Sequence, residues 1–527
     1  MLFRSRALPF HGYAVISVDE RGHGDSAETS NARIIDPTLE VQDLRAILDW
    51  AYDNAAEFNF RRQSGTGVER DLIVGTLGVS YGGGFQMPLA ALDGRIDAIV
   101  PNGTWNNLLY SLLPGDGVKL SFDGLLCTLA ASSGTVNTPL VAALCNQVGP
   151  SNLTASAIRT RADLTAALAS PLSRPRSIAP EELDPFFYGH SMRYFETRQS
   201  AAAPWGYGEA AATLRPVPAL FLQGNRDVLF NLTEGFANAD YFRAAGGPVR
   251  VLTTEGGHMN PLASQVEGSA DCGTVGGIDA VYNWFERYLK DAAVPALDDL
   301  PAVCISVADT VPGTAGGSPA GVALASVPVG QLDGDGALPA TLASGSATVG
   351  ELIGATPQFV PVATVPDEAG WVLAGVPTVG RVEVVRRPSL LPRAPIAFVG
   401  VAIRRGGELI TVDEQRTPFI EGVHTSNRGQ QNAVVALPGV GEQLQPGDEV
   451  GLVFVEADVQ YAAIVSAQSF PNLLNVVNLA LGTSIPAIGS ALDGSLLAAP
   501  NPYDVTVDDV RLPIFKAGVY AGSSLRR

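Results

Sequence analysis

The sequence predicts an α/β domain built on a parallel β-sheet, followed by an all-β domain. Apolar strand-like runs alternate with helical patterns from about residue 13 to 290, as in α/β proteins. Beyond about residue 305 the chain has short β-rich runs separated by turn residues and no convincing long helix. A chain of 527 residues is also too long for one compact core. Together these observations favour two or three domains.

The first elements of the predicted parallel sheet lie before residue 105. We expect a strand over 13–18 and a helix over 39–54, then strands over 72–77 and 96–100. The helix is predicted because four apolar residues fall on one face at helical spacing, namely Leu44, Ile47, Leu48 and Ala51. The strands are nearly continuous apolar runs, which is typical of a parallel sheet covered by helices on both faces.

Residues 106–210 interrupt this alternation with Ala/Leu-rich, helix-like segments, and we expect them to form a helical cap over the site. Strands are again expected over 218–224 and 249–253. A last amphipathic helix is expected from an apolar stripe of Ile278, Val281, Phe285 and Tyr288. These elements complete a predicted α/β domain over residues 1–292.

The Pro/Ala/Asp-rich residues 293–304 are predicted to be a linker, and residues 305–527 a β-sandwich or jelly roll. The β-rich runs of the second domain cover 381–385, 396–403, 409–412, 433–437, 450–455 and 503–510. Gly406-Gly407 and Pro446-Gly447-Asp448 are typical turn sequences between them.

The charge and composition exclude several classes of partner. A net charge of −19 argues against nucleic acid and against anionic membrane surfaces. Residues 459–492 carry no charge, but their Gln, Asn, Gly and Pro residues are wrong for a membrane span. The chain has no Cys-x-x-Cys and only five histidines, so no structural zinc site is expected.

The four cysteines allow two disulfides, Cys127–Cys145 and Cys272–Cys304. These would indicate an oxidising, extracellular or periplasmic compartment, whereas the alternative is four buried free thiols. No signal peptide is visible, and Met1 lies within a few residues of the first expected strand. We therefore expect a truncated N-terminus that lacks upstream strands of the sheet.

The most informative motif is Gly78-Val79-Ser80-Tyr81-Gly82, which follows an apolar strand and precedes a possible helix. In this context G-x-S-x-G is typical of a nucleophile elbow, a strained turn that projects its serine from the sheet. Small residues two before and two after the serine leave room for the close packing of the turn. The motif predicts Ser80 as a nucleophile.

A serine hydroxyl needs an imidazole to take its proton and a carboxylate to orient that imidazole. In an α/β-hydrolase they follow in the order serine, acid, histidine, each after a strand. Only His258 directly follows a late strand, and Asp227 follows the strand before it. The sequence thus predicts a triad of Ser80, Asp227 and His258. Alternatively, Asp227 caps the helix expected over 231–245, and His258 is a structural loop residue.

One oxyanion donor is expected to be the backbone N–H of Tyr81, directly after the nucleophile. The second donor normally follows an earlier strand, and no matching loop precedes residue 12. Loss of one donor costs about 2.7–4 kcal/mol of transition-state stabilisation, so a truncated chain could be nearly inactive. The proposed chemistry uses only protein groups, and no metal or organic cofactor is expected.

The elbow, residues 12–26, the late Gly256-Gly257-His258 and the turn Pro446-Gly447-Asp448 together carry a family resemblance. From about residue 12 to 515 the chain resembles the CocE/NonD and X-prolyl dipeptidyl-peptidase (S15-like) group of serine hydrolases. The resemblance implies an α/β-hydrolase domain, a helical cap and a jelly-roll domain beside the active site. It also implies the same triad.

The expected substrate is a small-molecule ester, cleaved through an acyl-enzyme, or alternatively a peptide with proline second from its N-terminus. A dipeptidyl-peptidase needs cap carboxylates to hold the substrate ammonium. Candidates are Glu181, Glu182, Asp184 and Glu196, but no spacing singles them out. A further alternative is an inactive hydrolase or a carbohydrate-binding β protein. Trp371 is the only tryptophan after residue 300, so aromatic sugar platforms look sparse.

Overall fold

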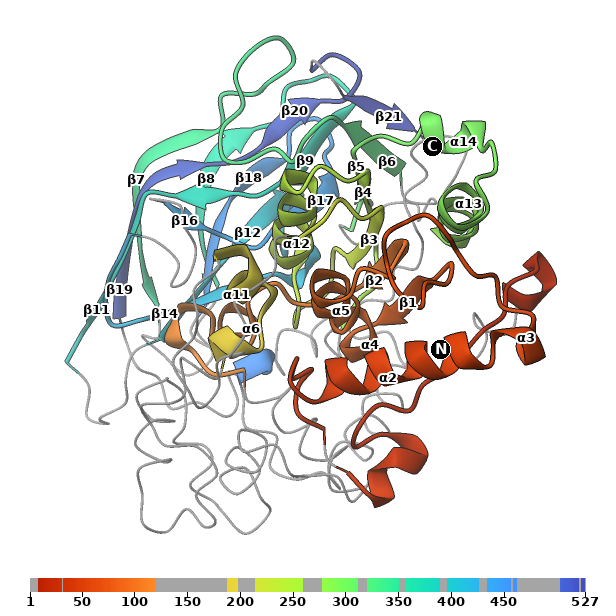
Figure 1. Cartoon of the computed structure of the whole chain (residues 1–527). Helices are drawn as coiled ribbons and strands as arrows, with labels where there is room; N and C mark the ends of the chain where they lie inside the picture. The colour runs from red at the N-terminus through yellow and green to blue at the C-terminus, as the bar shows by residue number, and fades with distance from the viewer. Residues whose placement is uncertain are drawn as a thin grey trace, which may run out of the picture.

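The computed structural model shows a seven-stranded, mostly parallel sheet with helices, next to antiparallel sheets (Figure 1). It describes residues 8–30, 32–119, 187–197, 214–258, 277–310, 320–349, 357–388, 396–425, 434–455, 458–461, 503–520 and 523–526. All structural statements below concern these residues. The predicted fold class, an α/β-hydrolase domain followed by antiparallel β-sheets, is confirmed.

The seven-stranded sheet has the order β1-β2-β3-β4-β5-β6-β21. Its parallel strands are β1 (Gly75–Val79), β2 (Ala98–Asn102), β3 (Ala219–Gly224), β4 (Val249–Thr254) and β5 (Val303–Val307). β6 (Ala320–Leu324) and β21 (Ser524–Arg526) join in antiparallel fashion. Every residue of β3 and β5 is buried, as expected for central strands covered on both faces.

Alternate residues of β3 pack against helices on opposite faces of the sheet. Phe221 points into a core that includes Phe242 of α12 (Leu232–Ala244). Leu220 and its neighbours pack instead with Trp284 of α13 (Gly277–Lys290). The remaining helices are α2 (Glu40–Asp53), α3 (Ala55–Phe58), α4 (Tyr81–Gly84), α5 (Gln86–Leu92), α6 (Leu108–Leu112), α11 (Met192–Thr197) and α14 (Pro295–Asp298). The helix predicted over 39–54 is therefore confirmed as α2.

Three antiparallel sheets follow the parallel strands. Their strands are β7 (Thr341–Val349), β8 (Gln358–Thr364), β9 (Trp371–Gly375), β10 (Thr378–Val379), β11 (Arg381–Arg386), β12 (Ile396–Arg405), β13 (Glu408–Thr411), β14 (Thr417–Ile420), β15 (Gly422–His424), β16 (Val435–Ala436), β17 (Val440–Gln443), β18 (Glu449–Val455), β19 (Tyr503–Arg511) and β20 (Ile514–Lys516). Valine and leucine residues of β11, β12, β18 and β19 form one shared core. Each predicted β-rich run thus contains a strand, although the run over 433–437 is a strand only at Val435–Ala436, and residue 412 belongs to a 3₁₀ turn.

The N-terminal segment departs from the prediction. Residues 13–18 are not a strand, because no strand in the described part of the chain pairs with them. Val15, Ile16 and Val18 are 38%, 44% and 36% exposed, so this apolar run lacks the half-buried surface on which strand residues pack. Tyr13 instead donates a hydrogen bond of 3.0 Å to Glu286 of α13.

The predicted linker over 293–304 also has regular structure. It contains α14, and β5 begins at its end and pairs with β4. The chain therefore continues the parallel sheet before it enters the antiparallel sheets. β6 and β21 extend that sheet further, so its last strands come from sequence beyond the predicted boundary.

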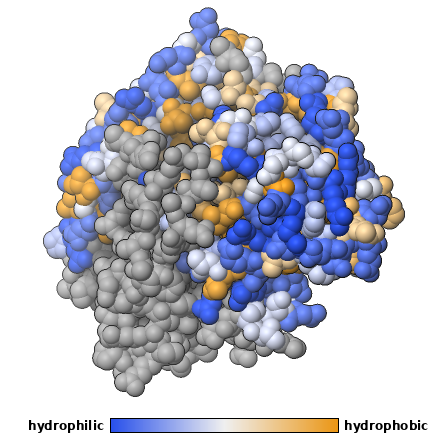
Figure 2. Space-filling view, in the orientation of Figure 1, coloured by the Kyte–Doolittle hydropathy of each residue, from blue (hydrophilic) through white to orange (hydrophobic). Residues whose placement is uncertain are grey.

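Three further predictions concern the cysteines, the surface and Trp371. Cys304 is buried in β5 and disulfide-bonded, but Cys127, Cys145 and Cys272 lie outside the described residues, so the pairings remain predictions. On the face shown in Figure 2, hydrophilic residues predominate among the described ones, with hydrophobic residues scattered among them. No helix within the described ranges is long and apolar enough to cross a membrane. Trp371 is buried in β9, so it offers no exposed ring for a sugar.

Candidate active site

Ser80 occupies a tight turn between β1 and α4. Its backbone has φ +57° and ψ −120°, a conformation that costs free energy for any residue other than glycine. A Cβ at Gly78 would lie 2.0 Å from the carbonyl oxygen of Gly82, so only glycine fits there. The Ser80 N–H donates to Asn102 O of β2 at 2.9 Å, and Ser80 O accepts from Gly83 N at 2.8 Å. These contacts hold the strained turn, and with it the serine side chain, in one position.

The structure brings Ser80, His258 and Asp227 together in one hydrogen-bonded chain. His258 Nε2 lies 2.8 Å from Ser80 Oγ, and His258 Nδ1 lies 2.7 Å from Asp227 Oδ2. The Asp227 side chain is fully buried, and its Oδ1 accepts from the N–H groups of Leu229 and Phe230 at 3.1 and 2.7 Å. An ionised Asp227 can only accept, which places the imidazole proton on Nδ1 and leaves Nε2 to accept from the serine hydroxyl.

Glycines allow the loops that carry Asp227 and His258 to pack tightly. A Cβ at Gly224 would lie 2.0 Å from Gly256 O. Gly257 has φ +126°, and a Cβ there would lie 2.5 Å from Cβ of Asp227. The two loops follow the neighbouring parallel strands β3 and β4, whose carboxyl ends meet at one edge of the sheet.

The alternative role for Asp227 as a helix cap is wrong. Asn231 occupies the N-cap of α12, and its side-chain oxygen accepts from Thr233 N at 3.1 Å. Glu234 and Asp240, two other carboxyl groups close to Asp227 in the sequence, lie within α12. Glu234 accepts from the N–H groups of Asn106 and Asn107, which ties it to the loop after β2.

Burial and the Asp227 carboxylate shift the pKa of His258 in opposite directions. Burial lowers the pKa of its imidazole, whereas the charge and hydrogen bond of Asp227 raise it, and the net pKa lies above the ordinary value of 6.5. The ammonium of Lys119 lowers the pKa further and does not reverse the direction. Lys119 is itself buried and donates to Val228 O at 2.6 Å, next to Asp227.

Tyr81, predicted to supply an oxyanion donor, begins α4. An N–H in the first turn of a helix has no acceptor within that helix, which suits the predicted role. The side chain points elsewhere, since its hydroxyl donates to Glu40 at 2.7 Å and accepts from Ile35 N at 3.0 Å. The half-buried Tyr81 side chain thus fixes the start of α4 against α2.

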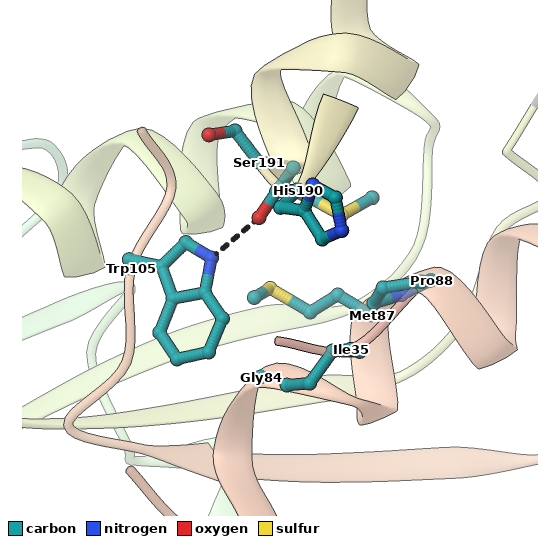
Figure 3. Close-up of a pocket in the computed structure, with 8 residues that line it drawn as sticks. Ile35, Gly84, Met87, Pro88, Trp105, His190 and Ser191 are labelled. Carbon is teal, nitrogen blue, oxygen red and sulfur yellow. Dashed lines mark hydrogen bonds between the residues drawn. The ribbon is translucent and has the colours of Figure 1, made fainter. Parts of the chain in front are cut away.

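Aromatic rings that the sequence did not single out border His258. Phe230 lies edge-on to the imidazole with ring centroids 5.2 Å apart, and Trp105 lies 5.2 Å from Phe230. Trp105 Nε1 donates to His190 O at 2.8 Å beside a small cavity (Figure 3). The cavity has a volume of only about 10 Å³ and is lined by Ile35, Gly84, Met87, Pro88, Trp105, His190, Ser191 and Met192. Trp105 and Phe230 could have been found from their positions after β2 and β3.

Three further carboxyl groups are buried and form one cluster: Glu255, Asp413 and Glu442. Burial, and then the charge of Glu255, raise the pKa of Asp413 well above its ordinary value. Burial and the charge of Asp413 likewise raise the pKa of Glu442. The neighbouring Arg226 opposes the shift of Asp413 without reversing it. These groups therefore hold protons at a pH where exposed carboxyl groups are ionised.

We expect this proton binding to make the protein less stable as the pH rises. An unfolded aspartate has a pKa of about 3.9, so between that value and the folded pKa the native state binds the extra proton. The free energy of unfolding then falls by up to about 1.4 kcal/mol per pH unit for each such group. As the pH rises above about 4, Asp413→Asn should lose less stability than the wild type in urea unfolding. The exposed Asp367→Asn serves as control, and an equal pH slope in all three proteins would contradict the expectation.

Comparison with known proteins agrees with this architecture. Residues 8–260 match the family described as X-Pro dipeptidyl-peptidase (S15 family). A CocE/NonD family hydrolase from Staphylococcus aureus superposes with a TM-score of 0.50 at 12% identity, over 94% of this chain and 79% of that chain. An aminopeptidase from a marine sediment archaeon, Thaumarchaeota archaeon, has a TM-score of 0.47 at 11% identity, over 95% and 83% of the two chains. No curated protein gives a significant match.

At 12% identity the staphylococcal structure supports the fold, and the family match adds the kind of chemistry. Both agree with a serine elbow at the carboxyl edge of a parallel sheet. The match of residues 8–260 to the S15 family, on this α/β-hydrolase fold, identifies the protein as a hydrolase of ester or peptide bonds.

Proposed function

We propose that this hydrolase cleaves acyl esters through a Ser80–His258–Asp227 triad and an acyl-enzyme. The observation that carries the proposal is the continuous hydrogen-bonded chain from Ser80 Oγ through the imidazole to the buried Asp227 carboxylate. A nucleophile in contact with a base, and a base oriented by a third group, is the arrangement that activates a serine hydroxyl.

The geometry suggests the following reaction. Ser80 Oγ attacks the substrate carbonyl carbon while His258 Nε2 takes the hydroxyl proton, and Asp227 stabilises the imidazolium. The N–H of Tyr81 donates to the oxyanion of the tetrahedral intermediate. The imidazolium then gives its proton to the leaving alcohol as the carbonyl–oxygen bond breaks. Water repeats the sequence, with His258 as base, and releases the acid.

The aromatic side chains beside the base favour an ester with an apolar acyl group. Phe230 lies against His258, and Trp105 lies against Phe230, so the surroundings of the base are apolar and suit burial of an apolar group. Of the cap carboxylates that could hold a substrate ammonium, Glu181, Glu182 and Asp184 lie outside the described residues, and Glu196 lies in α11. The S15 family match keeps X-Pro dipeptides as the second candidate substrate.

A paired substrate test separates these two candidates. The full chain is assayed with p-nitrophenyl butyrate and with Ala-Pro-p-nitroanilide, each beside Ser80→Ala. Ester turnover that needs Ser80, with a lower kcat/KM on the anilide, would support the acyl-esterase proposal. A higher kcat/KM on the anilide would overturn it in favour of a dipeptidyl-peptidase. Turnover that survives in Ser80→Ala would overturn the triad itself.

The pH dependence of kcat/KM should follow the His258 imidazole. Only the neutral imidazole can take the serine proton, and Asp227 holds its pKa above 6.5 in the folded protein. We therefore expect activity to fall about tenfold per pH unit below an acid-limb midpoint that lies above 6.5. A pH profile from 5 to 9 measures this midpoint. A midpoint well below 6.5 would contradict the assigned base.

A further inference from the structure

A short turn from the antiparallel part of the chain reaches the loop that carries Asp227. This turn, η6 (Val412–Glu414), lies between β13 and β14 and is followed by Gln415. Gln415 is only 3% exposed, and its Nε2 lies 3.0 Å from both Asn225 O and Asp227 O. Two carbonyl oxygens can be contacted only by the NH₂ end of the amide, so the orientation of the side chain follows from its partners. Gln415 therefore clamps the backbone on both sides of residue 226.

The backbone of this turn is strained, and a hydrogen bond to a buried carboxyl group holds it in place. Asp413 and Glu414 have φ values of +52° and +58°, a left-handed conformation that non-glycine residues seldom adopt. Such strain persists where surrounding contacts over-determine it. Here Asp413 Oδ2 accepts from Gly441 N of β17 at 2.8 Å.

β17 is docked in turn on β5 of the parallel sheet. A Cβ at Gly441 would lie 2.3 Å from Ser306 O, so the two backbones touch. Ser306 O also accepts from Asn225 Nδ2 at 2.7 Å, and the Ser306 hydroxyl donates to Glu255, three residues before His258. The acid loop and the base loop thus share one buried set of contacts with β5, β17 and η6.

The hydrogen bonds of the Asp227 carboxylate do not by themselves set its position. Oδ1 accepts from the N–H groups of Leu229 and Phe230, which belong to the same loop and would move with it. Val228 N–H donates to His258 O at 3.2 Å, which ties this loop to the base loop. Gln415 adds two hydrogen bonds to the backbone of this loop, from a segment nearly two hundred residues further along the chain.

We propose that Gln415 is a positioning residue, which fixes the Asp227 loop from the antiparallel part of the chain and so sets the carboxylate against His258. This inference rests on the proposed triad. Because a misplacement of about 1 Å in a catalytic group lowers a rate by about 10²-fold, loss of the clamp should lower kcat by a factor of that order. KM should change little, since Gln415 lies behind the acid and away from Ser80.

The test compares Gln415→Met, which keeps length and loses the donor, with Gln63→Met as a matched control. Gln63 Nε2 donates to Leu72 O at 3.2 Å and to Asp97 at 2.9 Å, before the start of β1 and at its far end from Ser80. The readouts are kcat and KM for p-nitrophenyl butyrate, the pH profile of kcat/KM, and the low-field NMR resonance of the His258 Nδ1 proton. If Gln415→Met does not fold, Gln415→Asn keeps the amide but cannot reach both carbonyls.

In the Gln415 variant we expect kcat to fall by about 10²-fold, the acid limb to move to lower pH and the low-field resonance to shift or broaden. Gln63→Met should keep the wild-type pH profile and resonance. An unchanged resonance and profile in a folded Gln415 variant would overturn the inference, as would equal kcat losses in both variants. The NMR readout needs no substrate, so failure of this inference is distinct from failure of the proposed function, which Ser80→Ala tests.

Discussion

Replacing Ser80 with alanine is expected to lower kcat for ester hydrolysis by about 10⁶-fold, because it removes the attacking atom of a group that acts as a unit. The substitution should leave the fold unchanged. Ser80 Oγ bonds to the side chain of His258, which is partly exposed, and alanine is no bulkier than serine in the strained turn. The free energy of unfolding should therefore stay within about 0.5 kcal/mol of the wild type.

Steady-state kinetics with p-nitrophenyl butyrate and urea unfolding measure these two effects together. Ser344→Ala is the matched control, since this exposed serine bonds to Asp508 between two strands of the antiparallel part. It should keep the wild-type kcat. A Ser80→Ala protein that is folded and retains kcat within tenfold of the wild type would show that another group attacks the ester.

The second large effect is expected for Asp227→Asn, which should lower kcat by about 10⁴-fold. Oδ1 accepts from two backbone N–H groups, so the asparagine carbonyl should keep that place. The NH₂ group then faces His258 Nδ1 and can only donate. This favours the imidazole tautomer with its proton on Nε2, which cannot accept the proton of Ser80.

Asp240→Asn provides the control for this substitution. Asp240 lies in α12, is exposed and pairs with Arg243, and it should keep the wild-type kcat. The acid limb of Asp227→Asn should also move to lower pH, since the carboxylate that raises the pKa of His258 is gone. A variant with wild-type kcat and an unshifted limb would remove Asp227 from the triad.

The elements around the site could be predicted because their signals are local. The apolar face of Leu44, Ile47, Leu48 and Ala51 predicted α2, and glycine spacing at Gly78 and Gly82 predicted the turn at Ser80. Asp227 and His258 were found because each directly follows a strand, and parallel strands bring their carboxyl ends together.

Other features depend on contacts that no local pattern encodes. Residues 13–18 have the composition of a strand, yet a strand needs a partner, and in this structure none pairs with them. Gln415 lies far from Asp227 in sequence and looks like an ordinary loop glutamine. Its contact with the acid loop depends on how η6 and β17 pack against β5, which is a property of the tertiary structure.

The most direct test of the central claim, that Ser80 is the activated nucleophile, is covalent labelling with a fluorophosphonate followed by peptide mass spectrometry. The hydroxyl oxygen displaces fluoride at phosphorus only when a base takes its proton, so the reagent reports activation without knowledge of the natural substrate. We predict one phosphonyl adduct, on the peptide that contains Ser80, and none in His258→Ala. An adduct on another serine, or equal labelling of wild type and His258→Ala, would contradict the account.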